Sequence, residues 1–220
     1  MRVIKKYKYI LLCIFAFVMV GVLSFLIAAN IKDTDAASTA GVNAGNIMSD
    51  YVMSNYNSMS EWDIQNFLKS KNPCNDSDWD KYVYNRDTYP GVSWHWDNGH
   101  FVCMADESFN GESAAHIIWQ AAQDYRINPQ VLIVLLEKEN GLVTDTYPHS
   151  GQYRTAAGFG CPDTAACDSK YFGLRDQVRQ AAELFREVLD GGWTNYPVGS
   201  NYIQYNPDSG CGGSWVNVEN

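Results

Sequence analysis

The sequence has few basic residues for its length. Its 220 residues include 16 Lys and Arg against 25 Asp and Glu, which gives a formal net charge of -9 at pH 7. Four of the basic residues and none of the acidic ones fall within the first thirty positions, so the remainder of the chain is more acidic still. Phosphate backbones are bound by basic surfaces. The shortage of positive charge therefore excludes nucleic acid as an expected partner.

Metal-ligand patterns are also scarce. The chain has four histidines, of which only His95 and His100 lie near one another, and none of its six cysteines forms a Cys-x-x-Cys pair. Structural zinc sites draw four ligands from such short, regular spacings. The sequence therefore predicts neither a metal site nor a cofactor.

Five cysteines follow residue 30, namely Cys74, Cys103, Cys161, Cys167 and Cys211. If this part of the chain is exported to an oxidising compartment, the spacing predicts one disulfide between Cys74 and Cys103 and another between Cys161 and Cys167. Cys211 is left over. It is either free or takes one of the other four as its partner.

An uncharged apolar run from Tyr9 to Ala29 follows a basic flank. At about 1.5 Å per helical residue this run reaches roughly 30 Å, which is long enough to span a bilayer. We therefore expect residues 1–30 to hold a cytoplasmic flank and a single-pass anchor that contacts the membrane through residues 9–29, with everything later extracytoplasmic. The alternative is a cleaved signal peptide and a secreted protein, with cleavage after Ala29 or Ala37.

Composition divides the exported part into three regions. Residues 31–46 are small and polar, which is typical of a flexible linker. Residues 47–104 are expected to form an accessory region, in which a helix begins after the N-cap Ser60 and an aromatic, turn-rich stretch with short strands follows. Residues 105–220 are expected to form the catalytic domain.

Three helices are predicted in that domain. Residues 112–125 carry an amphipathic stripe, and residues 170–190 repeat this pattern up to a Gly-Gly pair. Between them, a helix over residues 129–140 has Asn128 at its N-cap and Gly141 just past its end. Its apolar residues leave no polar face, so we expect it to be central and buried on all sides.

The central helix brings two carboxylates, Glu137 and Glu139, to its last turn. Successive residues rotate by about 100°, so these side chains point to nearly opposite sides and cannot form one site. The helix C-terminus and the loss of water both disfavour an ionised carboxylate there, and a general acid for glycosidic cleavage must hold its proton. Periodicity does not choose between the two, and the structural alternative is a solvent-facing glutamate paired with Lys138 or Arg154.

The run from Ala121 to Leu132, followed by Leu135 to Gly141, resembles the catalytic segment of the soluble lytic transglycosylase and goose-type lysozyme families of the lysozyme-like superfamily. In that segment Tyr-Gly-Val/Ile-Asp/Asn-Pro leads into an apolar helix that closes on Glu-Ser-Gly, an ending similar to that of the glucosaminidase branch. The catalytic Glu stands ten residues after the Pro and two before the Gly. The resemblance therefore implies that Glu139 is catalytic, with Glu137 as the fallback.

The resemblance is specific over residues 112–142, where Asn140 stands in place of the family's Ser. It implies a mainly helical α+β fold of lysozyme-like type behind the transmembrane helix, with residues 158–172 forming the wall that faces the catalytic helix. Two weaker similarities to the family extend the resemblance, namely Ala157-Gly158-Phe159-Gly160 and Tyr205-Asn206-Pro207. The substrate-binding residues expected on this basis are Phe159, Gly160, Tyr171 and Tyr205.

The resemblance also implies a function, the cleavage of peptidoglycan glycan strands between N-acetylmuramic acid and N-acetylglucosamine. Glu139 would protonate the leaving oxygen, and either water or the sugar's own hydroxyl would attack. Asp145, Asp163 and Asp168 lie in loops where aspartate more often forms turns, so no second carboxylate is assigned. A second class of function is a non-catalytic wall-binding or adhesion module that uses the aromatic stretch 79–101 as its glycan platform.

Overall fold

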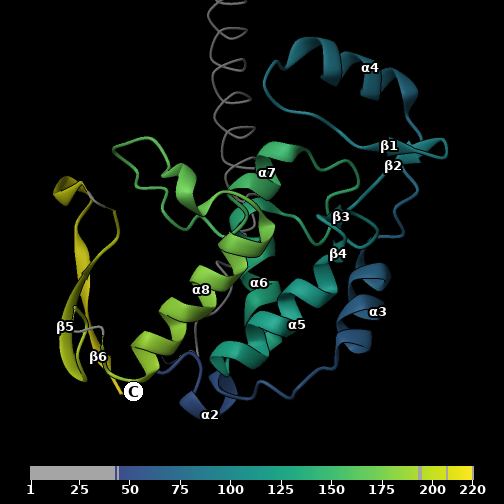
Figure 1. Ribbon diagram of the computed structural model, residues 1–220. Coiled ribbons are helices and arrows are strands. Elements are labelled where there is room, and N and C mark those ends of the chain that lie inside the picture. Colours follow the sequence, from purple (N-terminus) through teal and green to yellow (C-terminus); the bar gives the residue numbers. More distant parts are fainter. Residues whose placement is uncertain (1–42, 44, 193–194, 207, 220) are drawn as a thin grey trace, which may run out of the picture. The chain divides into compact units, whose positions relative to one another are not determined.

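The chain divides into two units, residues 1–43 and residues 44–220. The computed structural model describes residues 43, 45–192, 195–206 and 208–219, and hence nearly all of the second unit (Figure 1). The described residues form seven α-helices, two short 3₁₀ helices and three two-stranded antiparallel sheets. In chain order these are α2 (Asp50–Met53), α3 (Glu61–Lys71), α4 (Trp79–Thr88), β1 (Trp96–Asp97), β2 (His100–Phe101), β3 (Ser108–Phe109), β4 (Glu112–Ser113), α5 (Ala114–Tyr125), α6 (Pro129–Asn140), α7 (Ser150–Arg154), η1 (Ser169–Tyr171), α8 (Leu174–Leu189), β5 (Gly199–Gln204), η2 (Ser209–Cys211) and β6 (Gly213–Val218).

Helix α5 forms the middle of the core, where it contacts α3, α6 and α8 (Figure 1). Ile118 and Ala122 of this helix are fully buried. The helix starts two residues later than predicted because Glu112 and Ser113 form strand β4. The Ser113 hydroxyl then accepts the His116 N–H at 3.0 Å and caps the helix.

Helix α3 begins after Ser60, as predicted. The Ser60 hydroxyl accepts the Asp63 N–H, and the Asp63 carboxylate accepts the Ser60 N–H in return, which completes a capping box. Ile64 and Leu68 of this helix are buried in the same apolar cluster as the residues of α5 and α6. Residues 47–104 therefore share one core with the helices of residues 105–189.

Helix α6 has the predicted bounds. The Asn128 side chain accepts the Gln130 N–H at 2.9 Å, and Gly141 ends the helix with a φ of 65°. Burial on all sides was wrong, however, because Val134 is 64% exposed and only one side of the helix, which includes Leu132 and Leu136, is fully enclosed. When a helix is apolar on every side, its sequence does not show which side packs against the core and which side remains exposed.

The stretch from residue 73 to 104 contains a helix, α4, that was not predicted from the sequence. The Asp78 carboxylate accepts the Lys81 N–H at 2.9 Å at its start. Asn85 is its only buried residue, so no apolar stripe marks this helix in the sequence. The predicted short strands are present as β1 and β2.

The last predicted helix, over residues 170–190, begins later than expected. Residues Ser169–Tyr171 form the 3₁₀ helix η1, and Gly173 separates it from α8 with a φ of 106°. A continuous α-helix cannot pass through a residue in that conformation.

Both predicted disulfides are confirmed, Cys74–Cys103 and Cys161–Cys167, and Cys211 is a free, exposed thiol. Two disulfides fit a protein that matures in an oxidising, extracellular compartment.

The predicted fold class needs a correction. The α+β, mainly helical character is present, but none of the described helices is long and apolar enough to cross a membrane. The longest of them, α8, has 16 residues and reaches only about 24 Å, and it carries charges such as Arg175 and Asp176. The expected anchor over residues 9–29 and most of the expected linker lie outside the described residues.

Candidate functional site

Glu139 lies in the last turn of α6, beside the backbone of Gly158. A Cβ atom added to Gly158 would come within 3.3 Å of Glu139 Oε2, and Gly158 has a φ of +69°. The other carboxylate oxygen, Oε1, is 2.7 Å from Lys138 Nζ. The Glu139 side chain keeps 31% of its surface exposed, so it is open to solvent rather than enclosed as expected. Its carboxylate can therefore be reached by a molecule from outside.

Glu137 has a different role. Its carboxylate accepts the main-chain N–H groups of Val143 at 3.0 Å and Thr144 at 3.2 Å, as well as the Thr144 hydroxyl at 2.8 Å. All three donors lie in the turn that follows Gly141. Glu137 therefore fastens this turn to α6, and the two carboxylates serve different sides of the helix, as the rotation per residue predicts.

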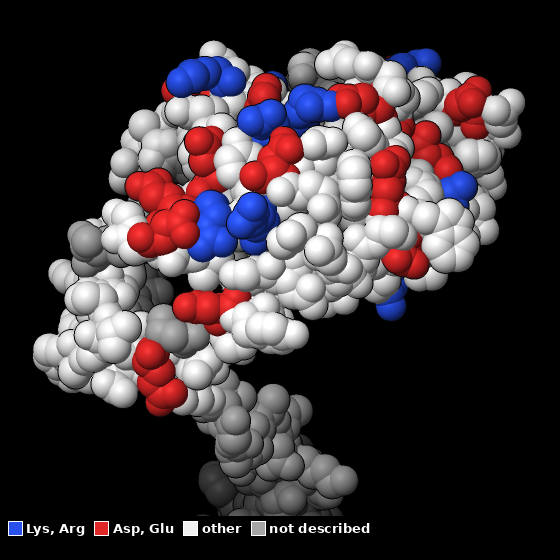
Figure 2. Space-filling view, turned by 60° about the horizontal axis from the view of Figure 1, so that its bottom comes forward, with Lys and Arg blue, Asp and Glu red and all other residues white. Residues whose placement is uncertain are grey.

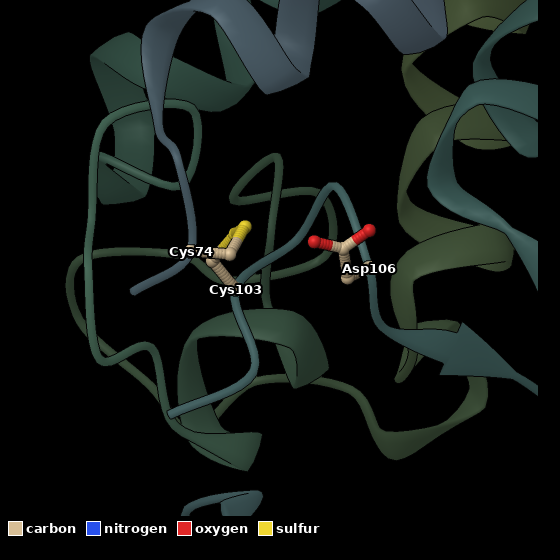
Figure 3. Close-up of side chains that lie close together, drawn as sticks. All are labelled: Cys74, Cys103 and Asp106. Carbon is tan, nitrogen blue, oxygen red and sulfur yellow. A yellow bond between two sulfur atoms is a disulfide. The ribbon is translucent and has the colours of Figure 1, made fainter. Parts of the chain in front are cut away.

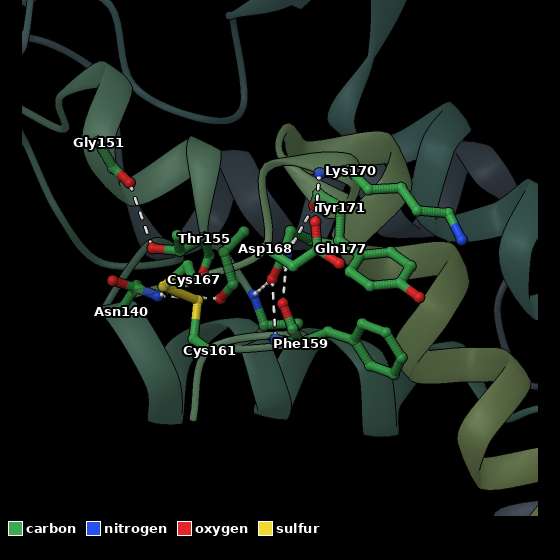
Figure 4. Close-up of a disulfide and its surroundings, with 12 residues drawn as sticks. Asn140, Gly151, Thr155, Phe159, Cys161, Cys167, Asp168, Lys170, Tyr171 and Gln177 are labelled. Atoms are coloured by element: carbon green, nitrogen blue, oxygen red, sulfur yellow. Dashed lines mark hydrogen bonds between the residues drawn. A yellow bond between two sulfur atoms is a disulfide. The ribbon is translucent and has the colours of Figure 1, made fainter. Parts of the chain in front are cut away.

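Asn140, which stands where the resembled family has Ser, joins α6 to the segment before Gly158. Its side-chain amide donates to the carbonyl oxygens of Thr155 at 2.9 Å and Ala156 at 3.2 Å (Figure 4). This places residues 155–158 against the end of the helix, so the exchange of Ser for Asn preserves a polar link at this position.

Gln177 of α8, which was not predicted from the sequence as a site residue, holds the facing wall together. Its side chain is completely buried. Its Oε1 accepts the N–H groups of Ala157 and Phe159, at 3.1 and 3.0 Å, and its Nε2 donates to the carbonyls of Phe159 and Tyr171, at 2.9 and 2.7 Å (Figure 4). The one feature of the sequence that could have indicated this role is that a polar residue lies between Leu174 and Val178 on the apolar stripe of α8.

The wall lines a pocket of about 610 Å³ that includes Phe159, Gly160 and Tyr171, three of the four predicted substrate residues. The rings of Phe159 and Tyr171 meet edge to face, with centroids 4.9 Å apart. The Tyr171 ring also packs against Gly160, where an added Cβ would lie 2.6 Å from it. Leu135, one helical turn before Glu139, lines the same pocket. Glu139 does not line the pocket itself, but it lies beside Gly158 and one helical turn after Leu135, which both do.

The Cys161–Cys167 disulfide closes the loop that borders this pocket (Figure 4). The Asp168 N–H donates to the Gly160 carbonyl at 2.8 Å, and the Asp168 side chain caps η1 through the Lys170 N–H. Asp168 is therefore engaged in turn formation, as expected for an aspartate in such a loop.

Tyr205, the fourth predicted substrate residue, is not brought to this pocket. It lies in the connection between β5 and β6, is 69% exposed, and pairs its hydroxyl with that of Ser214. Tyr205 instead makes a contact within this local hairpin.

Among the described residues, one group of metal-ligand side chains comes together, Cys74, Cys103 and Asp106 (Figure 3). Its two sulfur atoms are joined as a disulfide, so they offer no thiolate to a metal. His95 and His100, the two histidines that are close in sequence, contact different partners. His95 Nδ1 lies 2.9 Å from a Glu107 oxygen, and His100 Nδ1 lies 2.8 Å from the Phe101 carbonyl.

Charges of both signs are interspersed on the surface. On the face in Figure 2, Lys and Arg side chains lie beside Asp and Glu, with uncharged areas between them. This face shows no continuous basic area of the kind that follows a phosphate backbone.

Comparison with known proteins gives one family. The model of the family described as "LasA, N-terminal domain" matches residues 46–189, about two thirds of the chain, and this range covers α2 to α8 with both disulfides. No curated protein and no solved structure matches the chain.

Proposed function

The chain belongs to the LasA N-terminal domain family, and we propose that it cleaves the glycan strands of peptidoglycan with Glu139 as its acid/base. The family and the two disulfides are consistent with a secreted, cell-wall-related protein. The choice of the glycosidic bond as the target is supported by the resemblance of residues 112–142 to the transglycosylase catalytic segment.

One observation carries the proposal. The Glu139 carboxylate lies beside Gly158, which lines the same pocket as Phe159, Gly160 and Tyr171. Aromatic side chains stack well on the apolar faces of sugar rings. A sugar held against Phe159 and Tyr171 would bring its glycosidic oxygen towards the end of α6, where Glu139 can donate a proton to it.

The chemistry then needs one carboxyl group. As the bond from the anomeric carbon to the glycosidic oxygen breaks, that oxygen takes the proton of Glu139. The ionised Glu139 next accepts a proton from the attacking hydroxyl, which belongs either to water or to the sugar itself. Lys138 stabilises the ionised form only weakly, because a pair this exposed contributes little.

Other carboxylates near in sequence support a single-glutamate mechanism. Asp145 accepts the side-chain amide of Gln152 at 2.7 Å and the N–H of Tyr147 at 2.9 Å. Asp168 lines the pocket itself, and one of its oxygens accepts the Lys170 N–H at the start of η1. Each of these aspartates makes hydrogen bonds that shape the chain locally.

The test is the activity of Glu139→Gln and Glu137→Gln on peptidoglycan, by zymography and by the clearing of wall suspensions. Glu139→Gln keeps the shape of the side chain but cannot transfer the proton, so activity should fall about 100- to 10,000-fold with folding intact. Glu137→Gln should remain active but be less stable, because the amide replaces a carboxylate that accepts three hydrogen bonds. An inactive Glu137→Gln beside an active Glu139→Gln would refute the assignment.

A second candidate function is a non-catalytic wall-binding module. Trp79, Tyr82 and Trp96 form an aromatic cluster with all ring centroids 5.2 Å apart, and Trp79 is 53% exposed. Wild-type protein that sediments with peptidoglycan but releases no fragments, together with loss of sedimentation in Trp79→Ala, would favour this function over cleavage.

A further inference from the structure

A second cavity, of about 640 Å³, is used neither by the resemblance nor by the proposed reaction. Its lining residues come from four stretches of the chain, within residues 93–95, 107–109, 148–154 and 172–174. This volume lies in the range of pockets that bind small ligands. Ser93, His95 and Arg154, which line the cavity, are exposed, so a molecule can enter it from solvent.

The main chain of Ser93, at this cavity, is already hydrogen-bonded. Its carbonyl accepts the Ser150 N–H at 2.8 Å, and its N–H donates to the Ser150 hydroxyl at 2.9 Å. Trp94 forms an antiparallel bridge with His149 beside this pair. An extended peptide binds chiefly by adding main-chain hydrogen bonds to a free strand edge, and it cannot pair with Ser93 in this way. These bonds therefore favour a ligand that is recognised by side chains.

The polar side chains of the cavity include both an acceptor and a donor. The Glu107 carboxylate, 14% exposed, accepts the Ser108 N–H at 2.9 Å and lies 2.9 Å from His95 Nδ1. An ionised carboxylate has about four acceptor positions, so Glu107 can accept further hydrogen bonds. The Arg154 guanidinium, a donor only, lies over the Phe172 ring, 5.2 Å from its centroid, and makes no ion pair with a carboxylate among the described residues.

This combination of groups suits an uncharged ligand that carries hydroxyls. A carboxylate or phosphate would be repelled by Glu107, and an amine would be repelled by Arg154. A purely apolar ligand would take water from both charged groups without replacing it. A sugar hydroxyl both donates and accepts, so sugar hydroxyls can donate to Glu107 and accept from Arg154. The hydroxyls of Ser93 and Ser108, which line the same cavity, can also do both.

Aromatic side chains add flat apolar surfaces to this site. Trp94, Phe109 and Phe172 line the cavity. The row of rings continues outwards from Trp94, because the Tyr89 ring lies 6.2 Å from it and the Tyr84 ring lies 6.4 Å from Tyr89, centroid to centroid. These two tyrosines are 49% and 60% exposed. Aromatic faces stack on the apolar faces of sugar rings, and this row offers such faces to more than one sugar unit.

We propose that this cavity binds an uncharged oligosaccharide, with one sugar unit held by Glu107 and Arg154 and the next unit stacked on Tyr89. The site shares no lining residue with the pocket beside Glu139, and it does not include the aromatic cluster around Trp79. The sugar chemistry is argued from the cavity alone. Only the choice of wall glycan as the first source to test rests on the proposed function.

The experiment measures the binding of two uncharged trimers, of N-acetylglucosamine and of β-1,4-linked glucose, to the full chain by titration calorimetry. The Glu139→Gln background prevents cleavage. Glu107→Gln and Arg154→Gln should each weaken binding about 10- to 100-fold, the usual effect of losing a hydrogen bond to a charged group. Either trimer supports the proposal if both variants weaken its binding, and the tighter trimer identifies the source, wall-like glycan or another polysaccharide.

Matched controls exist for both variants. Glu61 also lies beside a histidine, with its carboxylate 3.0 Å from His116 Nδ1, and Arg86 is an exposed arginine paired with Asp87. Neither residue lines the cavity, so Glu61→Gln and Arg86→Gln should bind the trimers as the parent does.

Tyr89→Ala gives a readout that a purely structural role would not produce. It should weaken binding of the trimer about 2- to 10-fold but leave binding of the single sugar unchanged, because the single sugar fits within the cavity. Tyr51→Ala, at an 83% exposed tyrosine of α2, should change neither.

Three results would overturn the proposal. They are no binding of either trimer, equal binding by the parent, Glu107→Gln and Arg154→Gln, or equally tight binding of an uncharged, N-acetylated tripeptide amide that Glu107→Gln also weakens. Binding needs no cleavage, so wild-type protein that is inactive on peptidoglycan would overturn the proposed function and leave this site intact. Conversely, an active protein whose trimer binding is unaffected by both variants would overturn this site alone.

Discussion

The hydrogen bonds of Gln177 predict a large and specific effect of one substitution. In Gln177→Leu a side chain of similar size leaves two N–H groups and two carbonyls of the wall without their partner. At about 1 kcal/mol for each hydrogen bond the loss would be about 4 kcal/mol. Residues 157–160 are only partly buried, so water recovers some of this, and we expect about 3 kcal/mol. For a chain of this length the melting temperature should fall by about 6–12 °C.

Thermal and urea unfolding measure this effect, with Gln180→Leu on the same helix as the control. Gln180 bonds only to the exposed Glu183, so its replacement should change stability by less than about 0.5 kcal/mol. Gln177→Glu adds a pH test, because it keeps the acceptor but turns a carboxylate towards two carbonyls. Its folded-state pKa should lie above the ordinary value of about 4.3, so it should be most stable below that pH and lose stability as the pH rises through the folded value. If Gln177→Leu unfolds like Gln180→Leu, Gln177 does not hold the wall.

Two further predictions concern single positions. Gly158→Ala should lower the free energy of unfolding by about 1–2 kcal/mol, because Gly158 has a left-handed backbone, and it should also reduce peptidoglycan cleavage, because the new Cβ would press on the Glu139 carboxylate. Gly191 also has a positive φ, +79°, but open space around it. Gly191→Ala should therefore lower the free energy of unfolding by the same amount without changing activity. Burial lowers the pKa of His149, although the nearby Asp145 carboxylate opposes this shift. The Nδ1 atom of His149 accepts the Gly151 N–H, so the neutral form of the ring stabilises the fold. The free energy of unfolding should therefore decrease as the pH falls below about 6.5 and then through the lower pKa that His149 has in the folded protein. His149→Asn keeps a hydrogen-bond acceptor but does not titrate, so this variant should lose the pH dependence.

The elements that the sequence predicted best are those whose ends have their own chemistry. Asn128 and Pro129 at the start of α6 and Gly141 at its end satisfy backbone groups locally, so their pattern is independent of the rest of the fold. Helix α4 has an equally good cap in Asp78 but no apolar stripe, and it was missed. A cap identifies where a helix begins only when a periodic pattern shows that a helix follows.

Three of the residues that line the candidate pocket were predictable from the sequence, but the hydrogen bonds that hold them in place were not. Phe159, Gly160 and Tyr171 were expected on resemblance, and they do line one pocket. Gln177, which positions them, lies in a different helix and acts through main-chain atoms of the wall. Main-chain partners leave no signature in the sequence, so only the three-dimensional structure shows why a glutamine interrupts that apolar stripe.

The different roles of the two glutamates follow from how the chain leaves α6. Gly141 takes a left-handed conformation, and the turn after it brings the N–H groups of Val143 and Thr144 back towards the helix. The carboxylate on that side, Glu137, is used to bind them. A residue two positions later points about 200° away and cannot reach the same donors, so Glu139 is left to face the next segment of chain, at Gly158. The same turn that makes Glu137 structural thus leaves Glu139 available for chemistry, which is why we expect only Glu139→Gln to abolish activity.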